Sequence, residues 1–191
     1  MTDTENKRGS RWWRATAAIT AVIGVTVTTV VWRVDRTSAT TAAPTGFVHY
    51  QDRTDGFSFD HPNSWRTTTV PGGVLLTISG SNAVSLRRTD LDRPVDTSRL
   101  ADLRAVTDAV IDSPEAHLGV LKAEATTVGG LPGVYYLYTF GTGADRGAHT
   151  HWFAFHGRAM YSLVFQALPD TGFAALAPDF DAVVNSFRVQ A

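Results

Sequence analysis

The chain has 191 residues, no cysteine, and a formal net charge of −1 from 17 basic and 18 acidic residues. The lack of cysteine excludes disulfides and thiol chemistry. Residues 44–191 hold 11 of the basic and 15 of the acidic residues, a net charge of −4. Because no basic surface is predicted from that balance, we expect no nucleic acid among the partners.

Residues 15–32, which begin at Ala15 and end at Trp32, form an uncharged stretch that predicts a transmembrane helix. As a helix it would be about 27 Å long, close to the roughly 30 Å hydrocarbon core of a bilayer. Four basic residues precede the stretch and two follow it, which favours a cytoplasmic N-terminus. We therefore expect a cytoplasmic tail over residues 1–14, a stalk over 33–46 that is rich in Thr and Ala, and an exported domain over 47–191.

A cleaved secretory signal is the competing interpretation of residues 15–32. The apolar run is longer than the central region of most signals, and no clean Ala-x-Ala cleavage site follows it. These two observations favour a retained single-pass anchor in the cell membrane, with the domain outside. If the segment were cleaved, the domain would be secreted.

The exported part opens with alternating apolar residues separated by turn residues, a pattern typical of strands. Strands are predicted over residues 47–51, 57–60, 65–70, 74–79 and 83–88. His61-Pro62 is expected to end the second of these strands, and Pro71-Gly72 and Gly80 to turn the chain.

A helix is predicted next, capped by Thr97 or Ser98 and ending near Pro114, because apolar residues recur there at helical spacing. Strands follow over residues 118–127, 134–140, 148–155 and 160–167, with a turn over 129–133 and a loop over 141–147. The last three strands are predicted to pair as consecutive antiparallel neighbours. A final helix begins near Thr171, and Pro178 is expected to kink or restart it. This order predicts an α+β fold with a central antiparallel sheet packed by helices.

Three segments of the exported part resemble the PsbP-like domains. They are Tyr50 with GFSFDHPNSW at residues 56–65, GLPGVYYLY at 130–138, and MYSLVFQALP at 160–169 followed by a helix that closes on PDFDAVVNSF. The resemblance covers about residues 47–188. It implies a central antiparallel sheet between helices, as in the luminal PsbP proteins of photosystem II and related bacterial envelope lipoproteins, which are mostly binding or assembly modules. The lipobox cysteine of the lipoprotein members is absent, and the resemblance carries no functional residue onto this chain.

His149 and His151 are the candidate metal ligands. Residues two apart on a strand share a face, so their two imidazoles could chelate one ion. His156 lies an odd number of residues further on and should point to the opposite face. The alternative interpretation is a pair of surface histidines at the solvent-side end of that face.

Catalytic motifs are weak in this sequence. Asp60, His61 and Ser64 are too close along one turn to form an oriented triad, and there is no Gly-x-Ser-x-Gly. We therefore expect a membrane-anchored, extracytoplasmic, non-catalytic binding or assembly module with no cofactor, whose partner is an envelope protein or a small ligand. The alternatives are a metal-binding or metal-dependent domain that uses His149 and His151, and an unrecognised hydrolase.

Overall fold

The computed structural model describes residues 45–111 and 119–190. Its elements, in chain order, are β1 (Phe47–Asp52), β2 (Phe57–Pro62), β3 (Arg66–Val70), β4 (Gly73–Ser79), β5 (Asn82–Asp90), α1 (Leu100–Ile111), β6 (Gly119–Val128), β7 (Leu131–Phe140), η1 (Gly143–Asp145), β8 (Gly147–His156), β9 (Ala159–Ala167), η2 (Asp170–Gly172), α2 (Phe173–Ser186) and β10 (Arg188–Val189). The predicted tail, the membrane helix and the stalk up to residue 44 lie outside the described residues. Within the described ranges, no helix is long and apolar enough to cross a bilayer.

A seven-stranded antiparallel sheet in the order β3-β4-β5-β9-β8-β7-β6 dominates the described fold. Hairpins join β3 to β4, β4 to β5, and each of β6, β7 and β8 to the next strand. The segment that contains α1 connects β5 to β6, and β9 returns to pair with β5. The predicted antiparallel run of β7, β8 and β9 is confirmed, and so is the α+β class.

A second, three-stranded sheet in the order β1-β2-β10 was not predicted. Its β2 runs through His61 and Pro62, two residues past its predicted end, because both still pair with β1. Strand β10 is only two residues long and pairs with the other end of β2. The small sheet therefore joins the first two strands of the described chain to its last strand.

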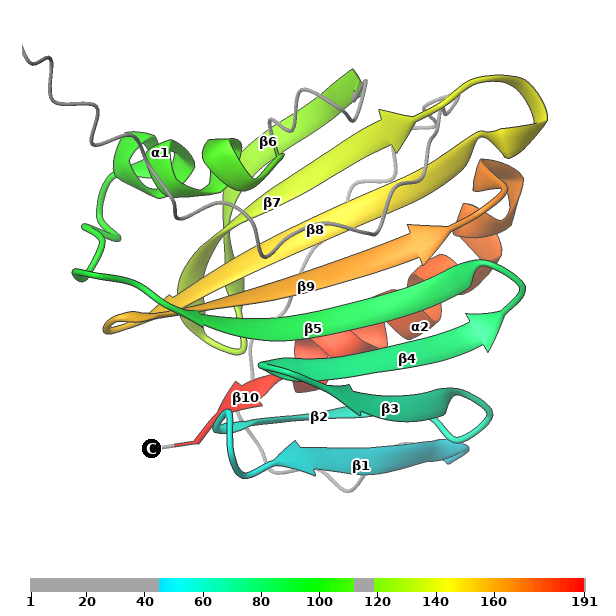
Figure 1. The fold of residues 1–191 in the computed structure, drawn as a ribbon, viewed down its shortest axis with the longest axis horizontal. Coiled ribbons are helices and arrows are strands. Elements are labelled where there is room, and N and C mark those ends of the chain that lie inside the picture. Colours follow the sequence, from blue (N-terminus) through cyan, green and yellow to red (C-terminus); the bar gives the residue numbers. More distant parts are fainter. Residues whose placement is uncertain (1–44, 112–118, 191) are drawn as a thin grey trace, which may run out of the picture.

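Successive residues of a strand point to opposite faces, so the large sheet supports two separate cores. Figure 1 shows α1 in front of the sheet and α2 behind it. Leu163 and Phe165 of β9 are fully buried on the α2 side, together with Phe180 and Val183 of the helix. The opposite face packs against α1 through a smaller apolar cluster: Leu103, Ile111, Val134, Tyr136, Tyr138, Phe153, Phe155 and Met160.

The predicted turn over residues 129–133 is shorter than expected, because β7 already begins at Leu131. Gly133 belongs to this strand, and a Cβ there would lie 2.0 Å from the backbone oxygen of Phe153. Its glycine is therefore explained by the close approach of β8 rather than by a turn.

Two helix details also differ from expectation. Helix α2 continues through Pro178 as one helix over Phe173–Ser186 instead of restarting there. Helix α1 begins at Leu100, and the backbone oxygen of Arg99 accepts from the N–H of Leu103 (3.2 Å), so Arg99 holds the cap position and the predicted cap at Thr97 or Ser98 is wrong. The hydroxyl of Ser98 donates to the Asp96 carboxylate (2.6 Å). Ser98 belongs instead to a local turn in which Asp96 also accepts its backbone N–H (2.9 Å).

Candidate functional site

His149 and His151 lie on β8 and point to the face of the sheet that carries α1. The prediction that they share a face is confirmed, since their rings both lie close to the ring of Tyr138 (5.2 and 6.3 Å between centroids). Each histidine is only 5% exposed, so the alternative of a surface pair is wrong. A buried imidazole needs hydrogen-bond partners, and all four ring nitrogens have one.

These partners form a continuous series, which we name the hydroxyl–imidazole chain: Ser162, His151, Tyr138, His149 and Gln166. The series spans β7, β8 and β9, and each strand contributes residues to the same face. The hydrogen-bonding role of Gln166, at one end of the series, determines which atom donates and which accepts at every other contact.

The amide of Gln166 fixes the protonation of His149. Its Nε2 donates to the backbone oxygen of Ser81 (2.6 Å), so its Oε1 is the acceptor that faces His149 Nε2 (2.8 Å). His149 must therefore carry its proton on Nε2. In the neutral ring, Nδ1 is then an acceptor, and the Tyr138 hydroxyl donates to it (3.2 Å).

The remaining hydrogen bonds then have only one consistent direction. The Tyr138 hydroxyl has a single proton, so its oxygen accepts from His151 Nδ1–H (3.3 Å). His151 Nε2 is consequently an acceptor, and the Ser162 hydroxyl donates to it (2.6 Å). All donors of the hydroxyl–imidazole chain thus point from Ser162 toward Gln166.

Burial keeps both imidazoles neutral. It lowers the pKa of His149 to about 4, against a smaller opposing effect of the hydrogen bond to Gln166. The pKa of His151 falls to about 3, first because of burial and then because of the neighbouring charge of His149. Burial also raises the pKa of the Tyr138 hydroxyl well above its usual value. The hydroxyl–imidazole chain is therefore uncharged at neutral pH, and its groups satisfy one another's hydrogen bonds.

Hydrolase triads also contain a serine hydroxyl that donates to a histidine, as Ser162 does to His151. However, the other nitrogen of His151 faces a tyrosine hydroxyl where a triad has a carboxylate. An imidazole whose pKa is about 3 is also a poor general base at neutral pH. The Ser162–His151 contact is thus better explained as structure than as nucleophile activation.

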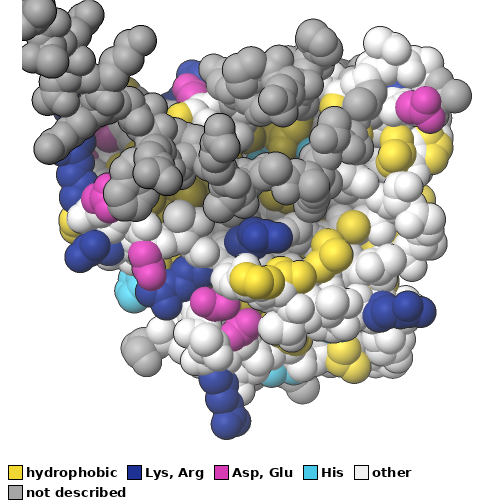
Figure 2. Space-filling model, viewed as in Figure 1, with side chains coloured by type: hydrophobic (Ala, Val, Ile, Leu, Met, Phe, Trp, Pro, Cys, Tyr) yellow, Lys and Arg dark blue, Asp and Glu magenta, His cyan; other side chains and the backbone are white. Residues whose placement is uncertain are grey.

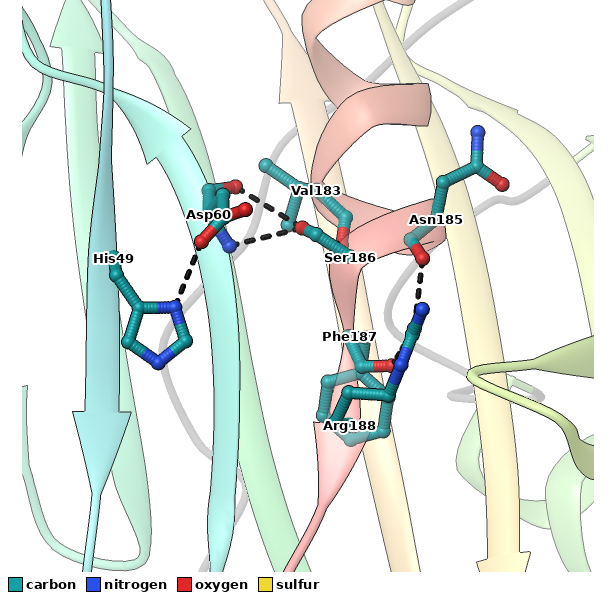
Figure 3. Close-up of polar contacts among 7 residues, drawn as sticks. All are labelled: His49, Asp60, Val183, Asn185, Ser186, Phe187 and Arg188. Atoms are coloured by element: carbon teal, nitrogen blue, oxygen red, sulfur yellow. Dashed lines mark hydrogen bonds and ion pairs between the residues drawn. The ribbon is translucent and has the colours of Figure 1, made fainter. Parts of the chain in front are cut away.

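A histidine–carboxylate pair does occur in the small sheet, where His49 Nδ1 of β1 lies 2.7 Å from Asp60 Oδ1 of β2. Ser186 at the end of α2 is nearby, but it contacts the backbone of Asp60, accepting from its N–H (2.9 Å), and the backbone oxygen of Val183 (3.1 Å). Figure 3 shows His49 and Ser186 on opposite sides of Asp60. The serine has no contact with the imidazole, so this group holds α2 to β2 and is not a triad.

Ion pairs on the two faces of the large sheet are short-range and mixed in sign. The pair of Arg88 Nη2 and Asp90 Oδ1 (2.6 Å) lies on the face opposite to α1, on the same side of β5 as the buried Leu86 of the α2 core. On the face that carries α1, Arg104 Nη2 lies 3.1 Å from Asp108 Oδ2. Figure 2 shows dark-blue and magenta side chains next to one another on this face. Two surface hollows, one lined by Asp90 and Arg158 and one that includes Arg104 and Asp108, have no histidine among their described lining residues.

A model of the PsbP family matches residues 45–189, which is most of the chain. The chain belongs to the PsbP family. The predicted resemblance is therefore confirmed, and residues 45–189 are called the PsbP domain below.

Solved structures show the same fold at low sequence identity. The solution structure of cyanobacterial PsbP (CyanoP) from Synechocystis sp. PCC 6803 matches with a TM-score of 0.54 and 19% identity, over 82% of this chain and 98% of that chain. The crystal structure of LpqN, described as involved in cell envelope biogenesis of Mycobacterium tuberculosis, matches with a TM-score of 0.53 and 12% identity, over 76% and 91%. A Bacteroides thetaiotaomicron structure matches with a TM-score of 0.54 and 11% identity, over 75% and 48%. A search of the curated proteins found no match.

Within the PsbP domain, the predicted metal ligands lack a visible third partner. His156 is exposed at the end of β8, away from the buried pair. Among residues 45–111 and 119–190, no group of three or more His, Asp or Glu side chains is placed to hold a metal ion. Metal binding by His149 and His151 stays a prediction.

Sequence reasoning missed three members of the hydroxyl–imidazole chain: Tyr138, Ser162 and Gln166. A signal for two of them exists in MYSLVFQ at residues 160–166, where Ser162 and Gln166 have even residue numbers and therefore share one face of a mostly apolar strand. That alternation indicates a strand with one apolar face and one partly polar face. The pattern could not show that the polar face is itself buried.

Proposed function

We propose that the chain is a membrane-anchored extracytoplasmic binding or assembly module of the cell envelope, without catalysis of its own. The observation that carries the proposal is the family membership over residues 45–189, joined to the uncharged stretch at residues 15–32. The likeness to LpqN, whose description names cell envelope biogenesis, supports an envelope role. The internally satisfied hydroxyl–imidazole chain supports a non-catalytic one, because none of its groups is left free for a substrate.

The location can be tested with a C-terminally tagged full chain in intact cells. Protease added outside should remove the tag-bearing domain, while a variant that lacks residues 1–32 should be protected inside the cell. The N-terminal sequence of the mature protein separates the two export routes, since a start near Pro44 would mean a cleaved signal and a released domain. Protection of the full-length protein from the protease would overturn the proposed topology.

The binding role needs a separate experiment. Photo-cross-linkers placed at exposed positions of β6 and of β3, the two edge strands of the described large sheet, would be activated in intact cells. We expect a defined envelope protein or small ligand to be captured from one edge and not the other. Capture of bulk lipid alone, or of nothing from either edge, would contradict a binding or assembly module.

A metal-binding function is the second candidate, and one geometric feature favours it. Nδ1 of His149 and Nδ1 of His151 both face the Tyr138 hydroxyl, at 3.2 and 3.3 Å. An ion that displaced this hydroxyl would meet the lone pair of His149 Nδ1, and also that of His151 Nδ1 once the His151 proton had moved to Nε2 and the Ser162 hydroxyl had turned to accept it; imidazole nitrogens suit zinc and other transition metals. Metal analysis of the purified full chain and of His151→Gln decides the matter, because an equal metal content in both would exclude the site.

A further inference from the structure

Strand β6 forms one end of the large sheet, and no described strand lies beyond it (Figure 1). An edge strand presents a row of backbone N–H and C=O groups that have no partner within their own sheet. Val120 is 46% exposed and Leu121 is 43% exposed, and they are two of the four large apolar side chains that are exposed among the described residues. This edge therefore offers both backbone hydrogen bonds and apolar surface to a further strand.

Two charged side chains of opposite sign stand next to each other on the same edge. Lys122 Nζ lies 2.7 Å from Glu124 Oε1, and both side chains are about half exposed. They share the face of the sheet that carries α2, since Glu124 is the direct neighbour of Tyr135 in the row that contains the buried Leu163. The Tyr135 ring, whose centroid is 5.8 Å from the Lys122 ammonium, helps to hold the lysine in place.

A second copy of the chain can pair with this edge only in certain registers. Along a strand, residues alternate between those whose backbone groups point to the inner neighbour and those whose groups point outward. When two identical strands pair antiparallel, each outward-pointing residue has to face another outward-pointing residue. The twofold axis must therefore pass through a residue and not between two residues, and each allowed register is defined by the residue at the axis.

The two charges distinguish these registers. An axis at Lys122 or at Glu124 places like charges directly opposite each other, which is destabilising. An axis at Ala123 instead places Lys122 of each copy opposite Glu124 of the other, so that two attractive pairs form at once. The same register brings the exposed Leu121 opposite the exposed Ala125. An axis at Ala125 pairs neither charge with an opposite one.

Charged residues and bulges also protect edge strands against pairing, and β6 has a bulge between Val120 and Lys122. A protective edge carries charges that repel a second copy of itself, most often lysines. On β6 the lysine is followed by a glutamate at the spacing that self-pairing requires, so the edge attracts its own copy. The bulge ends the regular part of the strand at Lys122, and both charged residues lie within that part.

We propose that β6 is a homodimer interface, in which two copies join edge to edge about a twofold axis at Ala123 and Lys122 of each copy pairs with Glu124 of the other. The two large sheets then continue as one antiparallel sheet. The assignment goes beyond the proposed binding role and does not rest on it, since membrane anchoring takes no part in the contact. It leaves β3, at the other end of the large sheet, for a different partner.

The test measures self-association of the purified full chain, solubilised in detergent, by analytical ultracentrifugation over a range of concentrations. We expect a concentration-dependent dimer. Lys122→Glu and Glu124→Lys each place like charges opposite one another twice per dimer, so each should weaken the dimer by about tenfold. The exchange variant, which carries both substitutions, restores opposite charges and should dimerise like the native chain. All of these variants should keep the fold, because both side chains are half exposed.

A mixture of the two single variants separates the contact between chains from the ion pair within one chain. Lys122→Glu carries two negative charges on β6 and Glu124→Lys carries two positive charges, so a mixed dimer has opposite charges at both positions. Differently tagged full chains should therefore co-purify as mixed dimers more strongly than either variant associates with itself. The inference is overturned if the native chain stays monomeric, if its dimer is insensitive to both single substitutions, if the exchange variant stays weak, or if no mixed dimer forms.

Discussion

At the scale of single residues, Tyr138 is the member on which the hydroxyl–imidazole chain depends. Its hydroxyl is the shared partner of His149 Nδ1 and His151 Nδ1, and all three side chains are nearly fully buried. Removing it leaves one acceptor and one donor unpaired in the interior, which costs about 1–3 kcal/mol for each such group when no water replaces the partner. We expect Tyr138→Phe to lower the free energy of unfolding by about 2 kcal/mol in urea titrations at neutral pH.

Tyr161 provides the control for that substitution. It is as buried as Tyr138, at 3% and 6% exposed, but its hydroxyl makes only a marginal contact of 3.5 Å with the backbone oxygen of Asp55. Tyr161→Phe should therefore change the unfolding free energy by about 0.5 kcal/mol or less. Equal losses in the two variants would show that the imidazole contacts contribute nothing specific.

At the scale of elements, α1 is held to the sheet by few groups. Leu103 and Ile111 bury its apolar side, and the Tyr136 hydroxyl of β7 donates to the Asp108 carboxylate (2.5 Å) and contacts the Thr107 hydroxyl (2.6 Å). Burial and then Asp108 raise the pKa of Tyr136 to about 12, so its proton is retained at neutral pH. This contact is the polar link between α1 and the sheet.

We expect Tyr136→Phe to loosen α1 while leaving the sheet intact. Amide hydrogen exchange in Leu100–Ile111 should become about tenfold faster, because about 1.4 kcal/mol of docking energy is lost, whereas β8 and β9 should exchange at native rates. Arg104→Gln removes a half-exposed pair with Asp108 and a side-chain contact with Tyr136 but leaves the Tyr136–Asp108 hydrogen bond in place, so it should have a smaller effect. Faster exchange throughout the PsbP domain would mean that Tyr136 supports the whole fold and not the docking of one helix.

The elements also show what could be predicted from sequence and what could not. Local patterns located nearly every strand, since alternation and turn residues act within a few neighbours, as in the hairpin at Gly80. The separate small sheet was missed because a two-residue strand such as β10 has no periodicity to detect. The shared face of His149 and His151 followed from parity along one strand. Their burial did not, because it depends on Tyr138, Ser162 and Gln166 from adjacent strands.

At the scale of the whole molecule, the buried histidines predict how stability varies with pH. In the unfolded chain their pKa is about 6.5, whereas in the folded chain it is about 4 for His149 and about 3 for His151. Between these values the unfolded state binds more protons, so the free energy of unfolding falls as the pH falls below about 6.5. At a pH below all of these values, the loss of unfolding free energy would be roughly 3 kcal/mol for His149 and roughly 5 kcal/mol for His151, before coupling.

The carboxyl group of Asp181 acts in the opposite direction. Burial raises the folded pKa of Asp181 to about 6, from 3.8, so the folded state binds more protons in that window and gains stability as the pH falls through it. This group is only half-buried, so its contribution is smaller than that of the two histidines. We therefore expect a lower free energy of unfolding at about pH 5 than at about pH 7, as measured by denaturant titration at each pH.

The double variant His149→Gln, His151→Gln isolates the effect of the imidazoles. It should be less stable than the native chain at neutral pH, because its hydrogen bonds are imperfect, but its unfolding free energy should change little or even rise on acidification. A slope equal to that of the native chain would contradict the assignment of neutral, buried histidines.

The position of β10 has a consequence for how the chain reaches its folded form. Phe187 is fully buried, and the two residues after it pair with β2, one of the first strands to be synthesised. The PsbP domain therefore cannot close its core until its last residues are available, because the pairings β5–β9 and β2–β10 join segments that are distant in the chain, and such non-local pairings slow folding. Completion of the fold therefore has to wait until synthesis has passed β10, because β10 supplies the last strand of the small sheet.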